Sequence, residues 1–189
     1  RKPGVCIVTA GPGFTNALSA IAAANFANTP LLFISGGTGH AARETWNLQD
    51  MEQGAIIQPM VKKVFLCNKP ERIHEFVDMA WRACTAGRPG PVYLEIPVDV
   101  ANMKVDEAKV HKINTLPEPR VVDRAKVLEF GALLLKAKKP IFIAGSGAYY
   151  SGAGAELQKF IEATGIPVFT GMQGRGVISD THPLCFGSP

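Results

Sequence analysis

The stretch that decides the fold is GVCIVTAGPGFTNA, residues 4–17. Residues 5–9 form a short apolar run without clean alternation, which is typical of a buried strand in a parallel sheet. Gly11 and Gly13 follow, and the alanine-rich segment 15–28 has the composition of a helix, which Thr15 or Asn16 would cap. This order puts the glycine turn at the carboxyl end of a strand, where open α/β sheets bind ligands.

The same alternation of apolar runs and helical periodicity continues along the chain. Strands are expected at 5–9, 31–35, 64–67, 92–96, 141–144 and 167–170. Helices are expected at 15–28, 70–86, 124–138 and 154–164. Continuous apolar strands separated by helices predict an α/β fold with parallel, doubly wound sheets covered on both faces.

Composition excludes several classes of protein. The chain has 189 residues, 47% of them hydrophobic and 19% charged, which is a globular ratio. Its net charge of +4 comes from scattered residues, so no basic stripe predicts nucleic-acid binding. The most apolar stretch, 17–27, is too short to span a membrane, which takes about 20 residues.

Cysteine and histidine usage predicts neither disulfides nor a metal site. The four cysteines have no CxxC spacing, and three of them (Cys6, Cys67 and Cys84) lie in apolar segments. Buried free thiols in a reducing, cytoplasmic compartment are the simplest interpretation. The four histidines are too far apart for metal-ligand spacing.

The chain divides into two expected units. Residues 1–101 are interpreted as one α/β unit and 122–189 as the opening of a second, joined by a linker at 102–121 that has mixed charge and two prolines. The second unit shows only two strands, and the chain starts without Met and stops in loop-like sequence. We therefore expect a piece of a longer protein.

Three loops follow strands and are candidates for chemistry. The first is the glycine turn at 11–13, which is also explained by a tight turn without a ligand. The second, 36–50, offers His40, Arg43, Glu44, Asn47 and Gln49, and is also explained as a solvated surface loop. The third, 144–148, contains a Gly-Ser-Gly that would suit a nucleotide phosphate or simple packing. Glu95 and Asp99 bracket Ile96 and Pro97, and a strand end with a turn explains them as well as a paired-carboxylate site does. From the residues alone, the prediction stops at two α/β units with ligand-type loops.

Five motifs, taken together, resemble those of thiamine-diphosphate-dependent enzymes of the acetolactate synthase and benzaldehyde lyase-like branch. In order, they are GVCIVTAGPGFTNA at 4–17, PLLFISG at 30–36, LQD at 48–50, GRPGPVYLEIPVDV at 87–100 and GRGVISDTHPL at 174–184. The resemblance implies that 1–101 is the later part of a pyrimidine-binding domain and 122–189 the start of a central domain. It also implies thiamine diphosphate with Mg²⁺, a 2-keto acid or aldehyde substrate, and a homodimer or homotetramer that binds neither nucleic acid nor membrane.

The resemblance assigns roles to particular residues. Gly11, Pro12 and Gly13 match a loop that approaches the aminopyrimidine ring across a dimer interface, with Asn16 just behind it. Gln49 matches a catalytic glutamine that projects toward the substrate end of the cofactor.

Other parts of the family's machinery have weaker counterparts or none in this chain. The loops 145–147 and 172–174 match central-domain loops that hold FAD or a CoA nucleotide in some members. The metal ligands and an activating glutamate are expected outside this chain, so the 189 residues alone are predicted to be inactive. The alternative is a non-catalytic module that binds FAD or an adenine nucleotide, or only dimerises.

Overall fold

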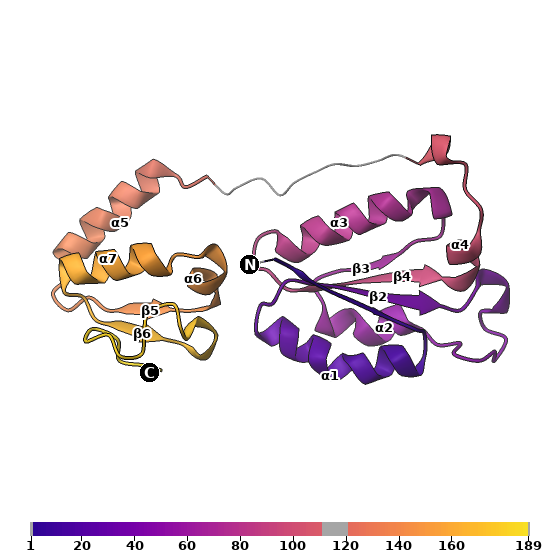
Figure 1. Ribbon diagram of the computed structural model, residues 1–189, viewed down its shortest axis with the longest axis horizontal. Helices are drawn as coiled ribbons and strands as arrows, with labels where there is room; N and C mark the ends of the chain where they lie inside the picture. The colour runs from indigo at the N-terminus through magenta and orange to yellow at the C-terminus, as the bar shows by residue number, and fades with distance from the viewer. Residues whose placement is uncertain (1, 111–120, 189) are drawn as a thin grey trace. The chain divides into compact units, whose positions relative to one another are not determined.

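A computed structural model describes residues 2–110 and 121–188. The chain separates into two compact units, Lys2–Pro117 and Glu118–Pro189 (Figure 1). Part of the linker expected at 102–121 lies outside the described residues, so those linker bounds remain a prediction.

The first unit is built on a parallel sheet of four strands in the order β1-β2-β4-β3. The strands are β1 (Gly4–Val8), β2 (Leu31–Gly37), β3 (Val64–Leu66) and β4 (Pro91–Pro97). Because all four run in one direction, their carboxyl ends meet at one edge. The parallel α/β fold predicted from the apolar runs is confirmed, with strand ends shifted by one or two residues.

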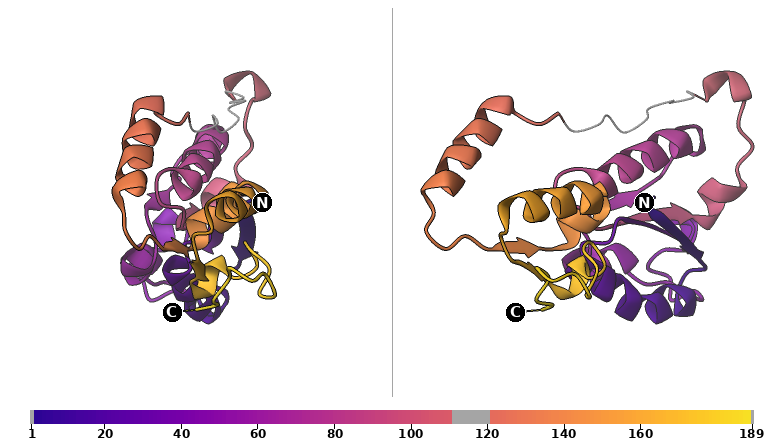
Figure 2. Two further views of the ribbon diagram at one scale, coloured as in Figure 1. Left: turned by 90° about the vertical axis from the view of Figure 1, so that its left-hand side faces the viewer. Right: turned by 60° about the vertical axis from the view of Figure 1, so that its left-hand side comes forward.

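Helices cover both faces of this sheet, as the apolar strands require. α1 (Pro12–Phe26) and α2 (Gln53–Ile57) lie on one face and α3 (Ile73–Thr85) on the other, while α4 (Val98–Asn102) follows β4 (Figures 1 and 2). Short 3₁₀ turns occupy His40–Ala42, Gln58–Met60, Pro70–Arg72 and Glu107–Lys109.

Each face has its own core. Under α1, the rings of Phe14, Phe33 and Tyr93 pack together, with centroids 5.4 Å apart for Phe14–Tyr93 and 5.5 Å for Phe33–Tyr93. All three are fully buried. Under α3, Leu32 and Leu94 pack with helix residues. Neighbours Leu32 and Phe33 thus point to opposite faces, as strand geometry dictates.

The second unit contains one pair of parallel strands, β5 (Phe142–Ala144) and β6 (Val168–Thr170). Its helices are α5 (Arg124–Lys136), α6 (Ser146–Ser151) and α7 (Gly154–Thr164), followed by a 3₁₀ turn at Met172–Gly174. α7 packs on the strand pair through the buried Ile161 (Figure 2). No residue of α5 is buried within the part of the chain that the structure describes.

Two details of the helices differ from the expectation. α1 begins at Pro12 rather than at residue 15, because proline suits the first helical position and Gly11 precedes it with φ +63°. Thr15 and Asn16 therefore do not cap the helix; the Thr15 hydroxyl donates to the Pro12 carbonyl within the first turn. The short helices α2 and α6 were not predicted at all.

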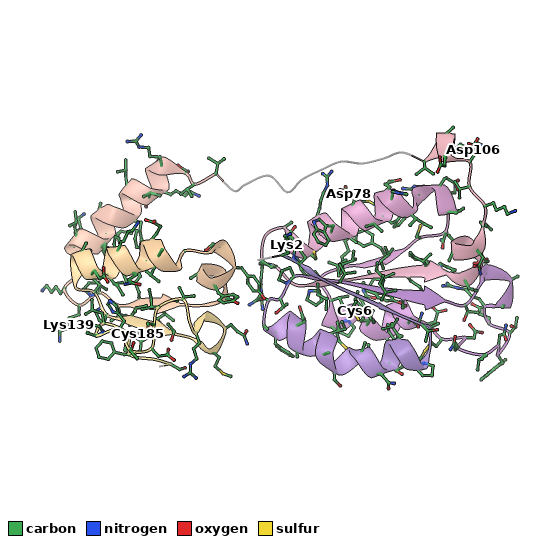
Figure 3. All side chains as sticks on the ribbon, in the orientation of Figure 1. Lys2, Cys6, Asp78, Asp106, Lys139 and Cys185 are labelled. Atoms are coloured by element: carbon green, nitrogen blue, oxygen red, sulfur yellow. The ribbon has the colours of Figure 1, made fainter. Side chains whose placement is uncertain are left out.

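All four cysteines carry free thiols. Cys67 and Cys84 are buried as expected, whereas Cys6 is only half-buried because its strand lies at the sheet edge. Cys6 lies in the first unit and Cys185 in the second (Figure 3). Among the described residues, no helix combines the length and apolarity that crossing a membrane requires.

Candidate active site at the carboxyl edge of the first sheet

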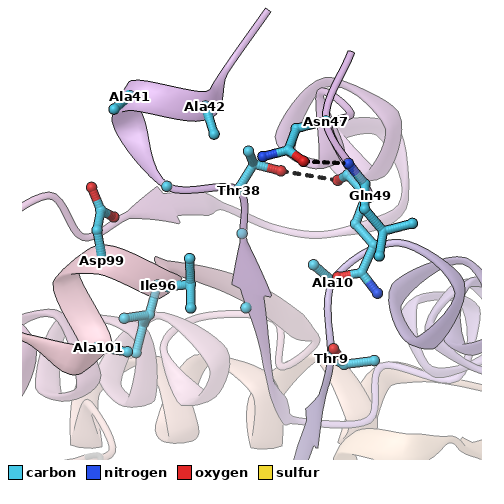
Figure 4. Close-up of a pocket in the computed structure, with 15 residues that line it drawn as sticks. Thr9, Ala10, Thr38, Ala41, Ala42, Asn47, Gln49, Ile96, Asp99 and Ala101 are labelled. Carbon is cyan, nitrogen blue, oxygen red and sulfur yellow. Dashed lines mark hydrogen bonds between the residues drawn. The ribbon is translucent and has the colours of Figure 1, made fainter. Parts of the chain in front are cut away.

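A pocket of about 400 Å³ opens at the edge where β1, β2 and β4 end (Figure 4). Three loops form it: the turn between β1 and α1, the long segment after β2, and the junction of β4 with α4. It is lined by Thr9, Ala10, Gly36, Gly37, Thr38, Gly39, Ala41, Ala42, Asn47, Leu48, Gln49, Ile96, Val98, Asp99 and Ala101. Small and apolar side chains dominate this wall, with a few polar groups among them, as is common in small-molecule sites.

Gln49 is the longest polar side chain in the pocket wall. Its backbone carbonyl accepts a hydrogen bond from the Thr38 hydroxyl at 3.1 Å, which ties the far end of the loop back to the end of β2 (Figure 4). Neither lysine nor arginine is among the described residues that line this pocket, and Asp99 is its one carboxylate. The pocket therefore suits an uncharged polar ring better than an anion.

Gly11 and Gly13 lack side chains because neighbouring side chains fill the space. A Cβ on Gly11 would lie 2.8 Å from Cγ of Gln49, and one on Gly13 would lie 2.7 Å from Cγ2 of Thr9. The glycine turn is thus the surface against which Gln49 packs. A side chain on Gly11 would displace Gln49.

Of the five residues predicted for the site, only Gln49 lines the pocket. Gly11, Pro12, Gly13 and Asn16 lie beside it at the start of α1. Pro12 and Asn16 are exposed there. The structure brings Gln49 and Gly11 into contact, and it leaves the outer face of the turn at Pro12 and Asn16 open.

The segment that carries Gln49 has an unusual backbone. Glu44, Trp46 and Gln49 all have positive φ angles, of 62°, 58° and 66°. Non-glycine residues in this region cost on the order of 1 kcal/mol or more each, and such strain clusters at functional sites. Trp46 is 98% exposed.

A buried amide lies directly beneath the pocket. Gln53, at the start of α2, is 1% exposed. Its Oε1 accepts from the Gly11 backbone N–H at 3.1 Å, and its Nε2 donates to the Gly36 carbonyl at 2.8 Å. The same Nε2 lies 3.4 Å from the Ser35 hydroxyl. One side chain thus joins the ends of β1 and β2.

A buried carboxylate continues this polar network. The Ser35 hydroxyl and the Tyr93 phenol are 2.5 Å apart, and the Tyr93 hydroxyl donates to Glu95 Oε2 at 3.3 Å. The Arg43 guanidinium donates to Glu95 Oε1 at 2.6 Å. Burial raises the pKa of the Glu95 carboxyl, and the positive charge of Arg43 opposes that rise. Burial likewise raises the pKa of Tyr93.

His40 takes part in a separate, more exposed cluster. Its Nδ1 lies 2.9 Å from Asp99 Oδ2, and its Nε2 lies 3.2 Å from Asn68 Oδ1. Burial would raise the pKa of Asp99, but hydrogen bonds from the His40 ring and from the backbone N–H groups of His40 and Val100 hold it below its ordinary value. The cluster anchors the start of the loop after β2 to the start of α4.

Sequence reasoning missed Gln53 and the pairing of Arg43 with Glu95. Glu95 lies near the end of β4, as expected, but its side chain is only 6% exposed and pairs with Arg43, which the explanation by a strand end and a turn did not include. The signal was present: an acidic residue within a buried strand requires a cation partner. No comparable signal marked Gln53, since its helix has only five residues.

The glycine loops of the second unit pack tightly against each other. Gly145 precedes α6, and Gly174 lies so close to Ala144 that any side chain there would collide with the Ala144 carbonyl oxygen. Packing thus explains Gly174. A Cβ on Gly145 or Gly147 would meet nothing within 4 Å, so space remains on that side of the loop.

Comparisons with known families agree across both units. Residues 1–56 match the model of the thiamine pyrophosphate enzyme N-terminal TPP binding domain. Residues 127–189 match that of the thiamine pyrophosphate enzyme central domain. The two matches occur in the same order as the two units of the structure.

Similar proteins extend over nearly the whole chain. Oxalyl-CoA decarboxylase of Escherichia coli (strain K12) is 36% identical over 97% of this chain and 34% of its own length. Acetolactate synthase large subunit of Corynebacterium glutamicum is 37% identical over 100% of this chain and 30% of its own length. Human 2-hydroxyacyl-CoA lyase 1 is 32% identical over 99% of this chain and 33% of its own length. The chain spans about a third of the length of these relatives.

Proposed function

The chain belongs to the thiamine pyrophosphate enzyme family, and from this premise we propose that the whole protein makes or breaks a carbon–carbon bond next to a carbonyl group. The reaction class is decarboxylation or carboligation of a 2-keto acid, with an aldehyde as a further substrate. When bound, thiamine diphosphate supplies the carbanion that such chemistry requires. The comparisons give no support to a non-catalytic nucleotide-binding or dimerising module.

The pocket fits one part of this cofactor and not the other. Its wall of glycines, alanines and short polar groups suits a flat, neutral heterocycle. A Cβ on Gly36 would be in ordinary contact with the Ala10 nitrogen, at 3.6 Å, and both residues line the pocket beyond the end of β1. The absence of a cationic lining residue from the described part of the chain argues that the diphosphate is bound elsewhere. This contrast between a polar, uncharged pocket and an anionic cofactor tail is the observation that carries the proposal.

Site roles follow from this fit. Gln49 is the proposed catalytic residue, because it projects into the pocket from a strained loop and rests on Gly11. Gly11, Pro12, Gly13 and Asn16 are the proposed cofactor-binding turn. Pro12 and Asn16 are exposed beside the pocket, and we propose that a second subunit covers this face of the turn in a homodimer or a homotetramer.

Two further ligands belong to the proposal. Mg²⁺ accompanies the diphosphate, and its ligands lie outside the described residues, among which no cluster of three His, Cys, Asp or Glu could hold a metal. FAD or a CoA nucleotide would use the loops at 145–147 and 172–174, where Gly145 and Gly147 face open space. Four free thiols favour a reducing, cytoplasmic location.

Calorimetric titration of the full-length protein with thiamine diphosphate tests the proposal. Binding that requires Mg²⁺ is expected, and the absence of binding with Mg²⁺ present would overturn it. Turnover is then assayed with pyruvate, as a simple member of the proposed 2-keto acid class, and with oxalyl-CoA and a 2-hydroxyacyl-CoA, which appear in the names of two relatives. A yellow purified protein would support bound FAD.

A further inference from the structure

Gln53 is a buried polar side chain that connects the turn after β1 with the end of β2 beneath the pocket. It is 1% exposed, and its amide oxygen and nitrogen both have backbone partners, one in that turn and one in β2. An amide can accept and donate at the same time. Gln53 therefore fixes the Gly11 N–H and the Gly36 carbonyl relative to each other.

The two hydrogen bonds of Gln53 act on Gln49 through one residue, Gly11. Gly11 carries the Gln53 hydrogen bond on its nitrogen, and Cγ of Gln49 packs where its Cβ would be. Gly36 lines the same pocket from the opposite strand. Any shift of Gly11 away from Gly36 moves the surface on which Gln49 rests. Because Gln49 already has a strained backbone, it depends on such support.

We propose that Gln53 is a positioning residue: its amide holds the Gly11 turn and the end of β2 at the separation that sets Gln49 in the pocket. The inference rests on the proposed function for the role of Gln49, whereas the hydrogen bonds themselves do not. Gln53 does not itself line the pocket. It acts through Gly11 and Gly36.

Gln53→Glu separates positioning from simple packing. A protonated carboxyl has one donor and one acceptor, so it reproduces both bonds of the amide. An ionised carboxylate can only accept hydrogen bonds. The variant's side chain then cannot donate to the Gly36 carbonyl, and two oxygens face each other with no hydrogen between them. The variant is therefore intact at low pH and defective at high pH, while the amide of the unmodified protein does not titrate.

The charged surroundings favour such a switch within the accessible pH range. From β4, Glu95 and Tyr93 face this site, Arg43 faces it from the loop, and Glu52 is its neighbour in the chain. Burial and the Glu95 carboxylate both raise the pKa of the introduced acid above its ordinary value of about 4.3. Arg43 opposes that rise but is engaged with Glu95.

The experiment uses the full-length protein and its Gln53→Glu variant at pH 5.5 and pH 8, with Gln58→Glu as the matched control on an exposed position. Three quantities are measured at each pH: the Kd for thiamine diphosphate with Mg²⁺, kcat, and hydrogen exchange of the peptide that contains Gly11. Relative to the unmodified protein, Gln53→Glu is expected to bind about tenfold more weakly at pH 8, the equivalent of one lost hydrogen bond. Its kcat should fall in parallel, and both defects should recover at pH 5.5.

The outcomes are distinguishable. Ratios to the unmodified protein that are the same at both pH values overturn the positioning role, whether the variant is equally good or equally poor. A pH-dependent rise in exchange at Gly11, in a full-length protein that binds no thiamine diphosphate, supports the bonding role and overturns the proposed function instead. Gln58→Glu showing the same pH dependence also overturns the inference.

Discussion

Arg43→Met is the perturbation whose effect the structure defines most sharply. It removes the cation 2.6 Å from Glu95 and leaves that carboxylate, 6% exposed, with Tyr93 and the Gln53 amide as its remaining polar partners. Removing one partner of a buried pair is costly because the other charge stays desolvated. Glu95 can avoid the cost of a buried, unpaired charge, however, because it can take up a proton in the folded state.

Protonation of Glu95 limits the loss of stability that Arg43→Met can cause. Protonating a glutamate with the ordinary pKa of about 4.3 costs about 3.7 kcal/mol at pH 7, at roughly 1.4 kcal/mol per pH unit, and this is an upper limit for Glu95 because burial already raises its pKa in the unmodified protein. Because Arg43 is 29% exposed and Tyr93 still donates, we expect a loss of about 2–3 kcal/mol at pH 7. At pH 5 the same limit is about 1 kcal/mol.

The sign follows from linkage. Without Arg43 the folded-state pKa of Glu95 is raised further above its unfolded value. The variant's deficit relative to the unmodified protein is therefore absent below the raised folded-state pKa that Glu95 already has beside Arg43, grows as the pH rises above that value, and levels off above the variant's own folded-state pKa.

Hydrogen exchange of β2 and β4 amides, corrected for the intrinsic exchange rate at each pH, measures this loss without assuming a single unfolding transition. Arg72→Met is the control, because it removes an exposed pair with Glu75 and should cost little stability at either pH. Equal losses at pH 5 and pH 7 would refute the reasoning. So would an undiminished loss for Arg43→Met in a Glu95→Gln background.

Three further predictions concern the pocket and the chain as a whole. Gly37→Ala would place a Cβ 2.5 Å from Glu95 Oε1 and should lower the stability of the fold by about 1–3 kcal/mol. Gly36→Ala is the control, because its Cβ would meet only Ala10 N at 3.6 Å, and it should melt within about 2 °C of the unmodified protein. Equal melting temperatures for the two variants would contradict the packing argument. Gln49→Ala in the full-length protein should lower kcat about tenfold or more with a nearly unchanged melting temperature, and an unchanged rate removes Gln49 from the site. The 189 residues alone should neither turn over substrate nor bind thiamine diphosphate tightly, which calorimetry and a turnover assay check; measurable turnover would show that the chain holds more of the site than we infer.

The sheet was predictable because its signal is local. The strands are apolar runs such as residues 31–34, and burial on both faces leaves no alternation to misread. Helix boundaries were less predictable: Pro12 and Gly11 set the start of α1 through backbone geometry, which outweighed the capping preference of Thr15 and Asn16. α2 is too short for periodicity to reveal it.

The site was only partly predictable, because its organisation depends on contacts between distant residues. The glycine turn and Gln49 were singled out from motifs 38 or so residues apart, and the structure shows them in contact. Arg43 lies in the loop after β2 and Glu95 in β4, and only the parallel pairing of β2 with β4 brings that loop over Glu95. Gln53 had no marker, because a buried amide is recognised by its partners and not by its neighbours in sequence.

The exposed indole on the strained loop provides a built-in optical reporter. The chain has two tryptophans, of which Trp81 packs against the α3 side of the core while Trp46 is 98% exposed. A water-borne collisional quencher such as iodide therefore reaches one emitter and is hindered at the other. Emission that resists quenching once a ligand or a second subunit covers the loop would report that event in real time, without any attached dye.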